Sequence, residues 1–361
     1  MAAKVRVGII GCGGIANGKH MPSLSKVAEA EMVAFCDIII ERAEEAAKKY
    51  GKGEAKVYND YKELLKDKSI DVIHVCTPNI SHSEISVAAL EAGKHVMCEK
   101  PMAKTVEGAK AMLAAAKKSG KKLTIGYQNR QNNEVAYLKK LCDDGVLGDI
   151  YYGKAVAIRR RAVPTWGVFL DKEKQGGGPL IDIGTHALDI TLWTMNNYEV
   201  ASVSGNVHYK LNSKENAANA FGSWDPKKFT VEDSAFGFVK MKNGATIIVE
   251  SSWAINLLDP QEAVCILAGT EAGADFKDGL RINGEKYSRL YVDKPDFSTG
   301  GVAFYDGAGS LDSGGKEAKQ WIMSIINDTT PTVLPEQALV VSEILEAIYK
   351  SHETGETIYF K

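Results

Sequence analysis

The first 125 or so residues alternate short apolar runs with amphipathic segments. Strands are predicted at 4–10, 31–37, 70–76, 94–98 and 122–126, and helices near 17–29, 40–50, 60–66, 82–92 and 105–119. The run 70–76 is apolar at nearly every position, which is typical of a parallel strand covered on both faces. Alternating strands and helices therefore predict a doubly wound parallel sheet, the Rossmann type of α/β fold.

The pattern changes after Gly126. Helices are predicted at 132–144 and 180–196, with a long strand at 149–161 between them. Beyond Val200 the sequence becomes rich in β-strand patterns. The runs 236–241 and 245–250 flank Asn243-Gly244, which favours a type I′ hairpin. A long loop is expected at 211–228, and closing helices at 316–327 and 335–353. We therefore expect a second α/β domain with a large, open, mostly antiparallel sheet and helices on one face.

Length and composition narrow the class of protein. The chain has 361 residues, more than the roughly 250–300 at which single cores stop growing, so we expect two domains, 1–126 and 127–361. Hydrophobic residues make up 45% of the chain and charged residues 25%, as in ordinary globular proteins. The net charge of −2 indicates neither nucleic acid nor an anionic membrane as a partner.

Targeting and metal signals are missing from the sequence pattern. No apolar run reaches about 18 residues, and the N-terminal residues lack the layout of a signal peptide, so we expect a cytoplasmic protein. The six cysteines form no Cys-x-x-Cys pair, and the seven histidines are scattered. Neither a disulfide framework nor a metal site is predicted.

A glycine-rich turn follows the first predicted strand. Gly11 permits a tight turn, Gly13 lets the backbone approach a pyrophosphate, and Ala16 allows helix and strand to pack closely. Asp37 closes the next strand roughly 20 residues on, where a carboxylate holds a ribose 2′-hydroxyl and repels a 2′-phosphate. This pattern predicts a dinucleotide site that prefers NAD, with NADP less favoured. Arg42 weakens that preference, because a nearby arginine can accommodate a phosphate.

Two further strands end in polar segments at the same predicted sheet edge. The third long strand is followed by Thr77-Pro78-Asn79, with His82 three residues on, and the next strand by Glu99-Lys100-Pro101. Ligands bind at the carboxyl ends of strands in open α/β sheets. Lys100 would then point toward the nicotinamide end of a dinucleotide, and Pro101 would hold it extended. On spacing alone, an ordinary surface lysine before a helix is an equal alternative.

A third segment combines glycines with an acid and a histidine. Asp182 and His186 follow Gly176-Gly177-Gly178-Pro179 and lie four residues apart, so on a helix they share a face. Beside a lysine this pair would suit hydride transfer from an alcohol, with the histidine taking the hydroxyl proton and the ammonium favouring alkoxide. The alternative is that Asp182 caps the helix and His186 is a buried core residue.

Candidate substrate contacts precede those glycines. Strand alternation sends Arg159 and Arg161 to one face and Arg160 to the other. Trp166 could lie flat on a ring of a ligand and donate its N–H. The alternatives are that Trp166 anchors a loop and that the arginines pair with acids at a subunit interface.

Taken together, the glycine motif, Glu99-Lys100-Pro101 and the Asp182-x-x-x-His186 helix resemble the glucose–fructose oxidoreductase, inositol dehydrogenase and MocA (Gfo/Idh/MocA) family along essentially the whole chain. The resemblance implies hydride transfer between NAD and a ring hydroxyl of a sugar, glycoside or cyclitol, with Lys100, Asp182 and His186 at the reacting carbon. Substrate contacts are expected from Arg159, Trp166, Asp182 and His186. The implied cofactor contacts are Gly11, Gly13, Gly14, Ile15, Asp37, Arg42, Thr77, Pro78, Asn79, His82, Glu99, Lys100 and Gln128. The run from the arginines to the glycines is similar to members that oxidise glycosides, including at the 3-position.

Two alternatives to a dehydrogenase stay open. One is a glycosidase that retains NAD and works by oxidation, elimination and reduction; the other is a dinucleotide-binding sensor without catalysis. Two structural expectations accompany the resemblance. The Lys100–Pro101 peptide is expected to be cis, and the chain is expected to form a homo-oligomer, a dimer, tetramer or larger, through the outer face of the second sheet, because one face of an open sheet carries no helices.

Overall fold

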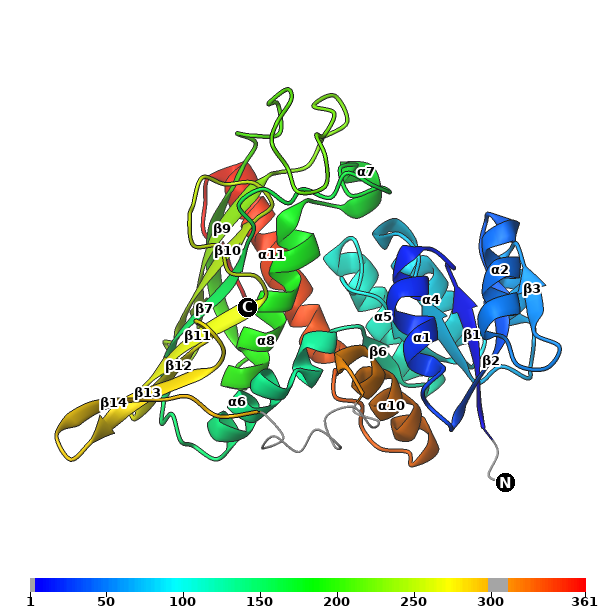
Figure 1. The fold of residues 1–361 in the computed structure, drawn as a ribbon, viewed down its shortest axis with the longest axis horizontal. Helices are drawn as coiled ribbons and strands as arrows, with labels where there is room; N and C mark the ends of the chain where they lie inside the picture. Colours follow the sequence, from blue (N-terminus) through cyan, green and yellow to red (C-terminus); the bar gives the residue numbers. More distant parts are fainter. Residues whose placement is uncertain (1–3, 298–310) are drawn as a thin grey trace. The chain divides into compact units, whose positions relative to one another are not determined.

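The computed structural model describes residues 4–297 and 311–361. The chain forms two compact units, one from residues 4–131 and 311–339 and the other from 132–297 and 340–361. The sequence predicts a single division after residue 126, whereas the two units are interleaved along the chain. Each unit contains one sheet (Figure 1).

The first unit contains a six-stranded sheet in which every pair of neighbours is parallel. Across the sheet the strands are β3 (Lys56–Tyr58), β2 (Ala30–Cys36), β1 (Val5–Ile10), β4 (Val72–Val75), β5 (His95–Cys98) and β6 (Leu123–Ile125). The order reverses direction between β1 and β4, which makes a switch point where ligands bind in this fold. The expected doubly wound parallel sheet is confirmed.

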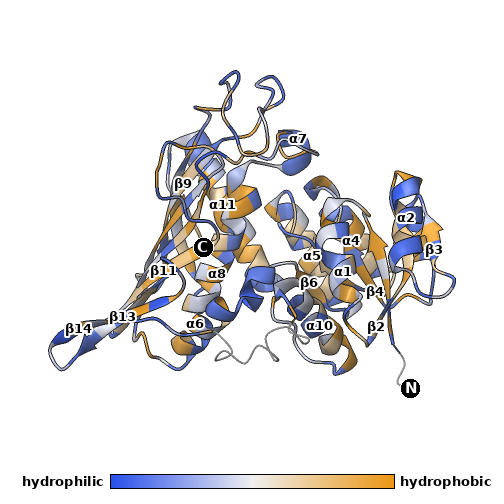
Figure 2. Cartoon of the chain, in the orientation of Figure 1, coloured by the Kyte–Doolittle hydropathy of each residue, from blue (hydrophilic) through white to orange (hydrophobic). Residues whose placement is uncertain are grey.

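Helices cover this sheet. They are α1 (Met21–Leu24), α2 (Ile40–Tyr50), α3 (Tyr61–Leu65), α4 (His82–Glu91), α5 (Val106–Ser119) and α10 (Ser313–Ile326), with short helical turns η1 (Ala16–His20), η2 (Asn79–Ser81) and η3 (Gln128–Gln131). Side-chain caps begin three of them: Asp60 accepts from the Lys62 backbone N–H at 2.8 Å, Thr105 from that of Gly108 at 3.2 Å, and Asp312 from that of Gly315 at 2.7 Å. All four residues of β4 are buried, and the strands around it are hydrophobic in Figure 2.

Helix α10 packs in the first unit although it lies near the end of the chain. Its Ala318, Trp321 and Ile322 are buried in one apolar cluster with residues of the first two strands, such as Val7 and Phe35. Trp321 is 1% exposed. The first sheet is therefore completed by a helix that the sequence assigned to the second domain.

Two short elements differ from the sequence prediction. The predicted helix 17–29 is instead the π-type turn η1 followed by α1, which ends at Leu24. Strand β3 was not predicted, because it has only three residues at the sheet edge and none of them is fully buried. Short edge strands carry a weak apolar pattern.

The described residues of the second unit form a nine-stranded sheet, confirmed as large and mostly antiparallel; among these strands only β10 and β7 pair in parallel. Across it run β14 (Arg289–Asp293), β13 (Arg281–Lys286), β12 (Ala272–Asp275), β11 (Val264–Gly269), β7 (Ile150–Ile158), β10 (Thr246–Ser252), β9 (Ser234–Met241), β8 (Val200–His208) and β15 (Ile358–Tyr359). Edge strand β14 is mostly exposed, including its Leu290 and Val292.

Helices lie along one face of this sheet (Figure 1). They are α6 (Asn133–Asp143), the turn η4 (Leu180–Gly184) leading into α8 (Thr185–Met195), and most of α11 (Pro335–Thr354), which begins in the first unit. The short α7 (Lys172–Gln175) precedes the glycines. Ten of the eleven residues of α8 are buried, so this helix sits in the core rather than at the surface.

The hairpin between β9 and β10 forms, but not with the predicted type I′ turn. Of Asn243 and Gly244, only Gly244 has a positive φ, at 91°. The Gly244 N–H donates to the Met241 carbonyl at 3.0 Å, and the Met241 N–H to that of Ala245 at 2.8 Å. The connection is therefore a longer turn closed by a left-handed glycine. Residues 211–228 form a loop, as expected.

Candidate functional site

The turn after β1 is shaped by Gly11, whose φ is +89°. A Cβ here would lie 2.7 Å from the Cys76 carbonyl oxygen, so only glycine fits. A Cβ on Gly13 or Gly14 would meet no protein atom within 4 Å. The backbone at these two glycines therefore faces open space, which is what close approach of a pyrophosphate requires.

Asp37 directly follows β2 beside this turn and is 7% exposed. Its Oδ2 accepts the Cys12 backbone N–H at 2.8 Å, and its Oδ1 accepts that of Ile39 at 2.9 Å. The carboxylate is thus fixed against the glycine turn, with lone pairs left that suit ribose hydroxyls. Ile15 and Arg42 are both exposed nearby in the chain, on the helices that follow β1 and β2.

The segments after β4 and β5 are joined by a histidine. His82 is 1% exposed, and its ring nitrogens face the Pro101 carbonyl at 2.8 Å and the Thr77 carbonyl at 2.9 Å. The ring therefore braces two strand ends against each other. Asn79 is buried in the same segment. The Lys100–Pro101 peptide is cis, which confirms that expectation.

A buried charge cluster surrounds Glu99. The Oε1 atom of Glu99 contacts the Lys19 ammonium and lies 2.7 Å from His20 Nε2, and its Oε2 accepts the Lys100 backbone N–H at 3.1 Å. Burial alone would raise the pKa of Glu99, but Lys19 and His20 hold it well below its usual range. Glu99 thus fixes the backbone at Lys100.

Lys19 extends this cluster. Its ammonium also lies 3.2 Å from Glu317 Oε2 on α10 and donates to Gln128 Oε1 at 3.2 Å. Burial lowers the pKa of Lys19, but Glu317 and Glu99 raise it above its usual value, so Lys19 stays charged. Glu99 and Gln128, two expected cofactor contacts, are therefore tied together through one lysine.

His20 and His74 share a hydrogen bond between their Nδ1 atoms at 2.9 Å. Burial lowers the pKa of both rings, so both are neutral. Because His20 Nε2 donates to Glu99, its Nδ1 is the acceptor, and the proton on the other side belongs to His74 Nδ1. No spacing in the sequence links these groups, since they come from three separate elements.

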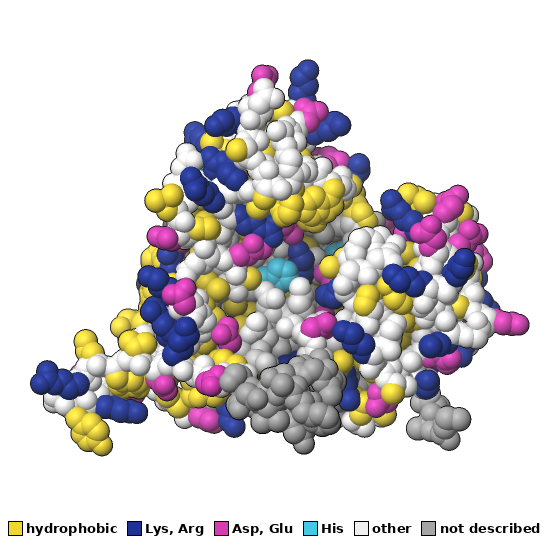
Figure 3. Space-filling view, viewed as in Figure 1, with side chains coloured by type: hydrophobic (Ala, Val, Ile, Leu, Met, Phe, Trp, Pro, Cys, Tyr) yellow, Lys and Arg dark blue, Asp and Glu magenta, His cyan; other side chains and the backbone are white. Residues whose placement is uncertain are grey.

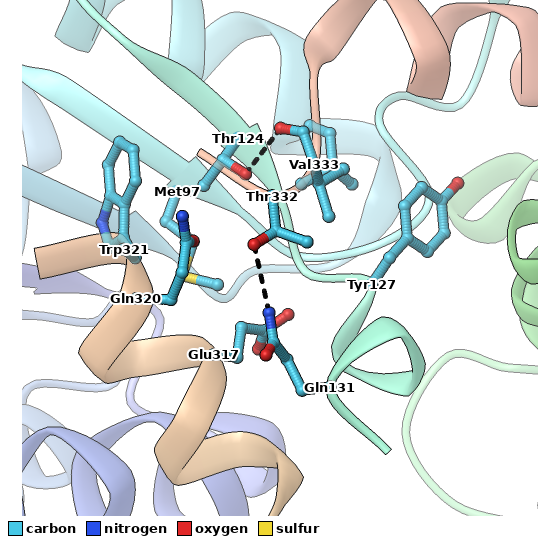
Figure 4. Close-up of a pocket in the computed structure, with 10 residues that line it drawn as sticks. Met97, Thr124, Tyr127, Gln131, Glu317, Gln320, Trp321, Thr332 and Val333 are labelled. Carbon is cyan, nitrogen blue, oxygen red and sulfur yellow. Dashed lines mark hydrogen bonds between the residues drawn. The ribbon is translucent and has the colours of Figure 1, made fainter. Parts of the chain in front are cut away.

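A small cavity lies between β6 and α10 in the first unit (Figure 4). Its walls include Thr124, which donates to the Val333 carbonyl at 2.9 Å, and Gln131, which donates to Thr332 at 3.3 Å. The cavity has room for about one water molecule. It is therefore too small for a dinucleotide or a sugar.

In the second unit, Asp182 lies in η4 and His186 in the first turn of α8; they are 8% and 9% exposed. The indole Nε1 of Trp253 donates to Asp182 Oδ2 at 3.1 Å. Trp253 is fully buried just after β10. Both candidate groups therefore sit on a helix embedded in the core, and one of them is fixed by a side chain that the sequence pattern did not single out.

The glycines before this helix pack on Glu232. Its two carboxylate oxygens accept the Gly178 N–H at 2.9 Å and the Leu180 N–H at 3.3 Å, and the Tyr349 hydroxyl at 2.8 Å. A Cβ on Gly177 would lie 2.0 Å from the Tyr349 hydroxyl oxygen. Burial raises the pKa of Glu232 to about 7, against the lowering effect of these hydrogen bonds. Glu232 was also missed by the sequence analysis.

The candidate substrate contacts divide into two kinds. Arg159 forms a two-point ion pair with Glu262, at 2.6 Å and 2.5 Å, so its acidic partner lies in the same chain. Arg161 donates to the Ile255 carbonyl at 2.8 Å and to Asn256 Oδ1 at 2.6 Å. Trp166 is different: it is 53% exposed and meets the rings of Phe169 and Phe221 edge to face.

Among residues 4–297 and 311–361, no three His, Cys, Asp or Glu side chains gather as metal ligands would. Within the same residues, no helix is long and apolar enough to span a bilayer.

Comparisons with known proteins agree with this arrangement. The model for an oxidoreductase family with an NAD-binding Rossmann fold matches residues 5–127, and the Gfo/Idh/MocA C-terminal domain model matches residues 135–275. The chain is 35% identical to D-glucoside 3-dehydrogenase from Escherichia coli K12, over 98% of this chain and 97% of that protein. It is 32% identical to inositol 2-dehydrogenase from Salmonella typhimurium LT2, over 55% and 57%.

Among solved structures, levoglucosan dehydrogenase in complex with NADH superimposes with a TM-score of 0.83 at 23% identity, covering 99% of each chain, and so shares the fold. The two family models together cover most of the chain, in the order and with the fold described above. The chain therefore belongs to the Gfo/Idh/MocA family of oxidoreductases with an NAD-binding Rossmann fold.

Proposed function

We propose that this protein oxidises a ring hydroxyl of a sugar or glycoside and passes the hydride to NAD, with Lys100, Asp182 and His186 acting at the reacting carbon. The 3-hydroxyl of a glucoside is the first candidate, because D-glucoside 3-dehydrogenase is similar over nearly the whole chain. Cyclitols are the second, since the similarity to inositol 2-dehydrogenase spans about half of each chain.

The first unit fits a bound dinucleotide. The backbone at Gly13 and Gly14 faces open space, and Asp37 holds a fixed carboxylate beside the glycine turn. The backbone N–H groups of the turn and of the helix start would hold the pyrophosphate. Contacts by Ile15, Thr77, Pro78, Asn79, Gln128 and the other residues implied by the resemblance remain proposals. Bound NAD would supply the hydride acceptor.

The chain's own residues would manage the proton and the charge. His186 would take the hydroxyl proton as the hydride leaves carbon, since an imidazole is well matched to proton transfer near neutral pH. The Lys100 ammonium would stabilise the negative charge that develops on the same oxygen. Asp182, held by Trp253, would orient the substrate or the imidazole.

One observation favours catalysis over mere binding: Asp182 and His186 are both buried, and Asp182 is held by a hydrogen bond. A sensor needs no proton-transfer group, yet here Trp253 holds the acid and Glu232 holds the glycine turn before it. Fixing side chains of this kind by a supporting layer of hydrogen bonds is typical of catalytic sites.

The test is a panel of glucosides, free sugars and inositols incubated with NAD and read at the NADH absorbance. We expect NADH formation with at least one glucoside, and its loss in the His186→Asn variant. Hydrolysis of a glycoside without net NADH would instead identify a glycosidase that retains NAD. Tight NAD binding with neither reaction would identify a sensor.

A further inference from the structure

A row of aromatic side chains leads from the surface of the second unit to Asp182. Successive rings in this row meet edge to face. The distance between ring centroids is 4.9 Å from Phe221 to Trp166, 5.9 Å from Trp166 to Phe169, and 6.4 Å from Phe169 to Trp253. Trp253 then donates its indole N–H to Asp182. We call Phe221, Trp166, Phe169 and Trp253 the aromatic row.

The outer end of the row is open. Trp166 is 53% exposed and Phe221 is 46% exposed, whereas Trp253 is fully buried and Phe169 lies between these extremes. Figure 3 shows hydrophobic side chains gathered on this unit near α7. Trp166 and Phe221 thus expose two large rings at the outer end of a row that reaches Asp182. This placement indicates a contact with a ligand.

The two loops that carry these rings are fastened together. Asn219 accepts the Val163 N–H at 2.8 Å and donates to the Val163 carbonyl at 2.9 Å. The Thr165 hydroxyl donates to the Phe221 carbonyl at 2.7 Å. The loops that carry Trp166 and Phe221 are therefore fastened to each other before any ligand arrives, so little backbone freedom is lost when one binds.

We propose that Trp166 and Phe221 bind the aglycone of a glycoside, a flat apolar group attached to the sugar that is oxidised at Asp182 and His186. The inference rests on the proposed function. Phe169 and Trp253 separate the exposed pair from Asp182, so a sugar ring reacting there leaves Trp166 and Phe221 to its substituent. Flat rings gain from edge and face contacts with aromatic side chains, and a methyl group gains little.

The experiment compares methyl and 4-nitrophenyl glucosides of the same anomer as substrates with NAD. In the wild type the 4-nitrophenyl glucoside should have the lower KM. Trp166→Ala and Phe221→Ala should each raise its KM, by roughly 10-fold at most for the loss of one ring contact, with little change in kcat. In Phe221→Ala, the KM for the methyl glucoside should stay within about twofold. Trp166→Phe should restore part of the loss.

Tyr287→Ala serves as the matched control, since Tyr287 is 99% exposed at the turn between β13 and β14 of the same unit and should change neither KM. Equal losses for both glucosides would overturn the proposal, because the rings would then bind the sugar itself or support the loop. If no sugar or glycoside yields NADH, the proposed function fails. In that case, the Kd of each glucoside for the NADH-loaded protein, measured by calorimetry, still tests the aglycone site. Equal Kd values for the two glucosides would contradict the proposed site.

Discussion

The indole N–H of Trp253 donates to a carboxylate oxygen of Asp182 at 3.1 Å, and both side chains are buried. A carboxylate in that setting is fixed in direction, because rotation would leave a buried donor without a partner. The acid of the proposed catalytic pair therefore depends on a residue about 70 positions further along the chain.

Trp253→Phe tests that dependence. The ring is kept, but the donor is lost, so the carboxylate of Asp182 should be held less firmly in its orientation. We expect kcat to fall roughly 10-fold, the cost of one hydrogen bond to a charged group. The Kd for NAD should not change. Turnover numbers and NAD titration measure the two effects, and an unchanged kcat would show that the bond has no part in catalysis.

His186→Asn tests the proposed base. General acid–base catalysis contributes roughly 10²- to 10⁴-fold, and kcat should fall by that factor. NAD affinity should barely change, since the residue is assigned to the substrate side. A near-normal kcat would transfer the role of base to Lys100 or a water molecule, and a loss of NAD binding would contradict the assignment of α8.

Asp37 should make NAD the preferred cofactor. Its carboxylate is held by the Cys12 and Ile39 backbone N–H groups, so it cannot swing away from a 2′-phosphate. We expect NADP to bind at least 10-fold more weakly than NAD, roughly the effect of one unfavourable charge contact. Asp37→Ser should reduce the difference in Kd between NAD and NADP. Comparable binding of both cofactors to the wild type would overturn this, with Arg42→Ala then showing whether the arginine is the cause.

Glu232 should make stability depend on pH. Its pKa is raised from 4.5 to about 7 in the folded protein, so between these values unfolding releases a proton. Stability then falls as the pH rises through this window, by up to roughly 3 kcal/mol at 1.36 kcal/mol per pKa unit. Glu232→Gln removes the titration, and its melting temperature should vary less between pH 4.5 and 7.

The matched control for that measurement is Glu285→Gln, a change at an exposed position on β13. Melting curves of the three proteins across the window give the comparison. Parallel curves for the wild type and Glu232→Gln would mean that Glu232 titrates in the folded state as it does in the unfolded chain.

The outer face of the nine-stranded sheet should hold copies of the chain together. On β10, Ile247 and Val249 are fully buried toward the helices, while Ile248 alternates to the other face and is only half-buried. Phe238 on β9, paired with Ile248, is 48% exposed. We expect light scattering at micromolar concentration to give a mass above that of a monomer, and Phe238→Glu to lower it. Ile38→Glu, an exposed change in the first unit, is the control; a monomeric wild type would contradict the prediction.

The strand and helix pattern of the first unit could be read from the sequence because buried parallel strands such as β4 are apolar throughout. Strand β3 and the early end of α1 could not, since three edge residues and a single π-type turn leave little periodic signal. The glycine turn and Asp37 were predictable from spacing alone. The hydrogen bonds that fix Asp37 in place could not be predicted, because they form only in the folded chain.

The supporting residues could not be predicted. Lys19, His74 and Glu317 come from three elements, and only the folded chain brings their side chains to Glu99 or to its partners. Trp253 and Glu232 are likewise distant in sequence from the helix that they hold. A sequence motif contains the residues that contact a ligand, whereas the residues that support them are brought together by the packing of the folded chain.

The interleaving of the two units has a consequence for engineering. The chain crosses from one unit to the other after residue 131, between residues 297 and 311, and after residue 339, so no single cut releases a complete nucleotide-binding unit. A fragment that stops at residue 131 lacks Trp321 and Ile322 and would leave their apolar partners uncovered. A chimera that takes its cofactor specificity from a relative must therefore import two separate stretches of sequence, and one joint has to be made inside helix α11.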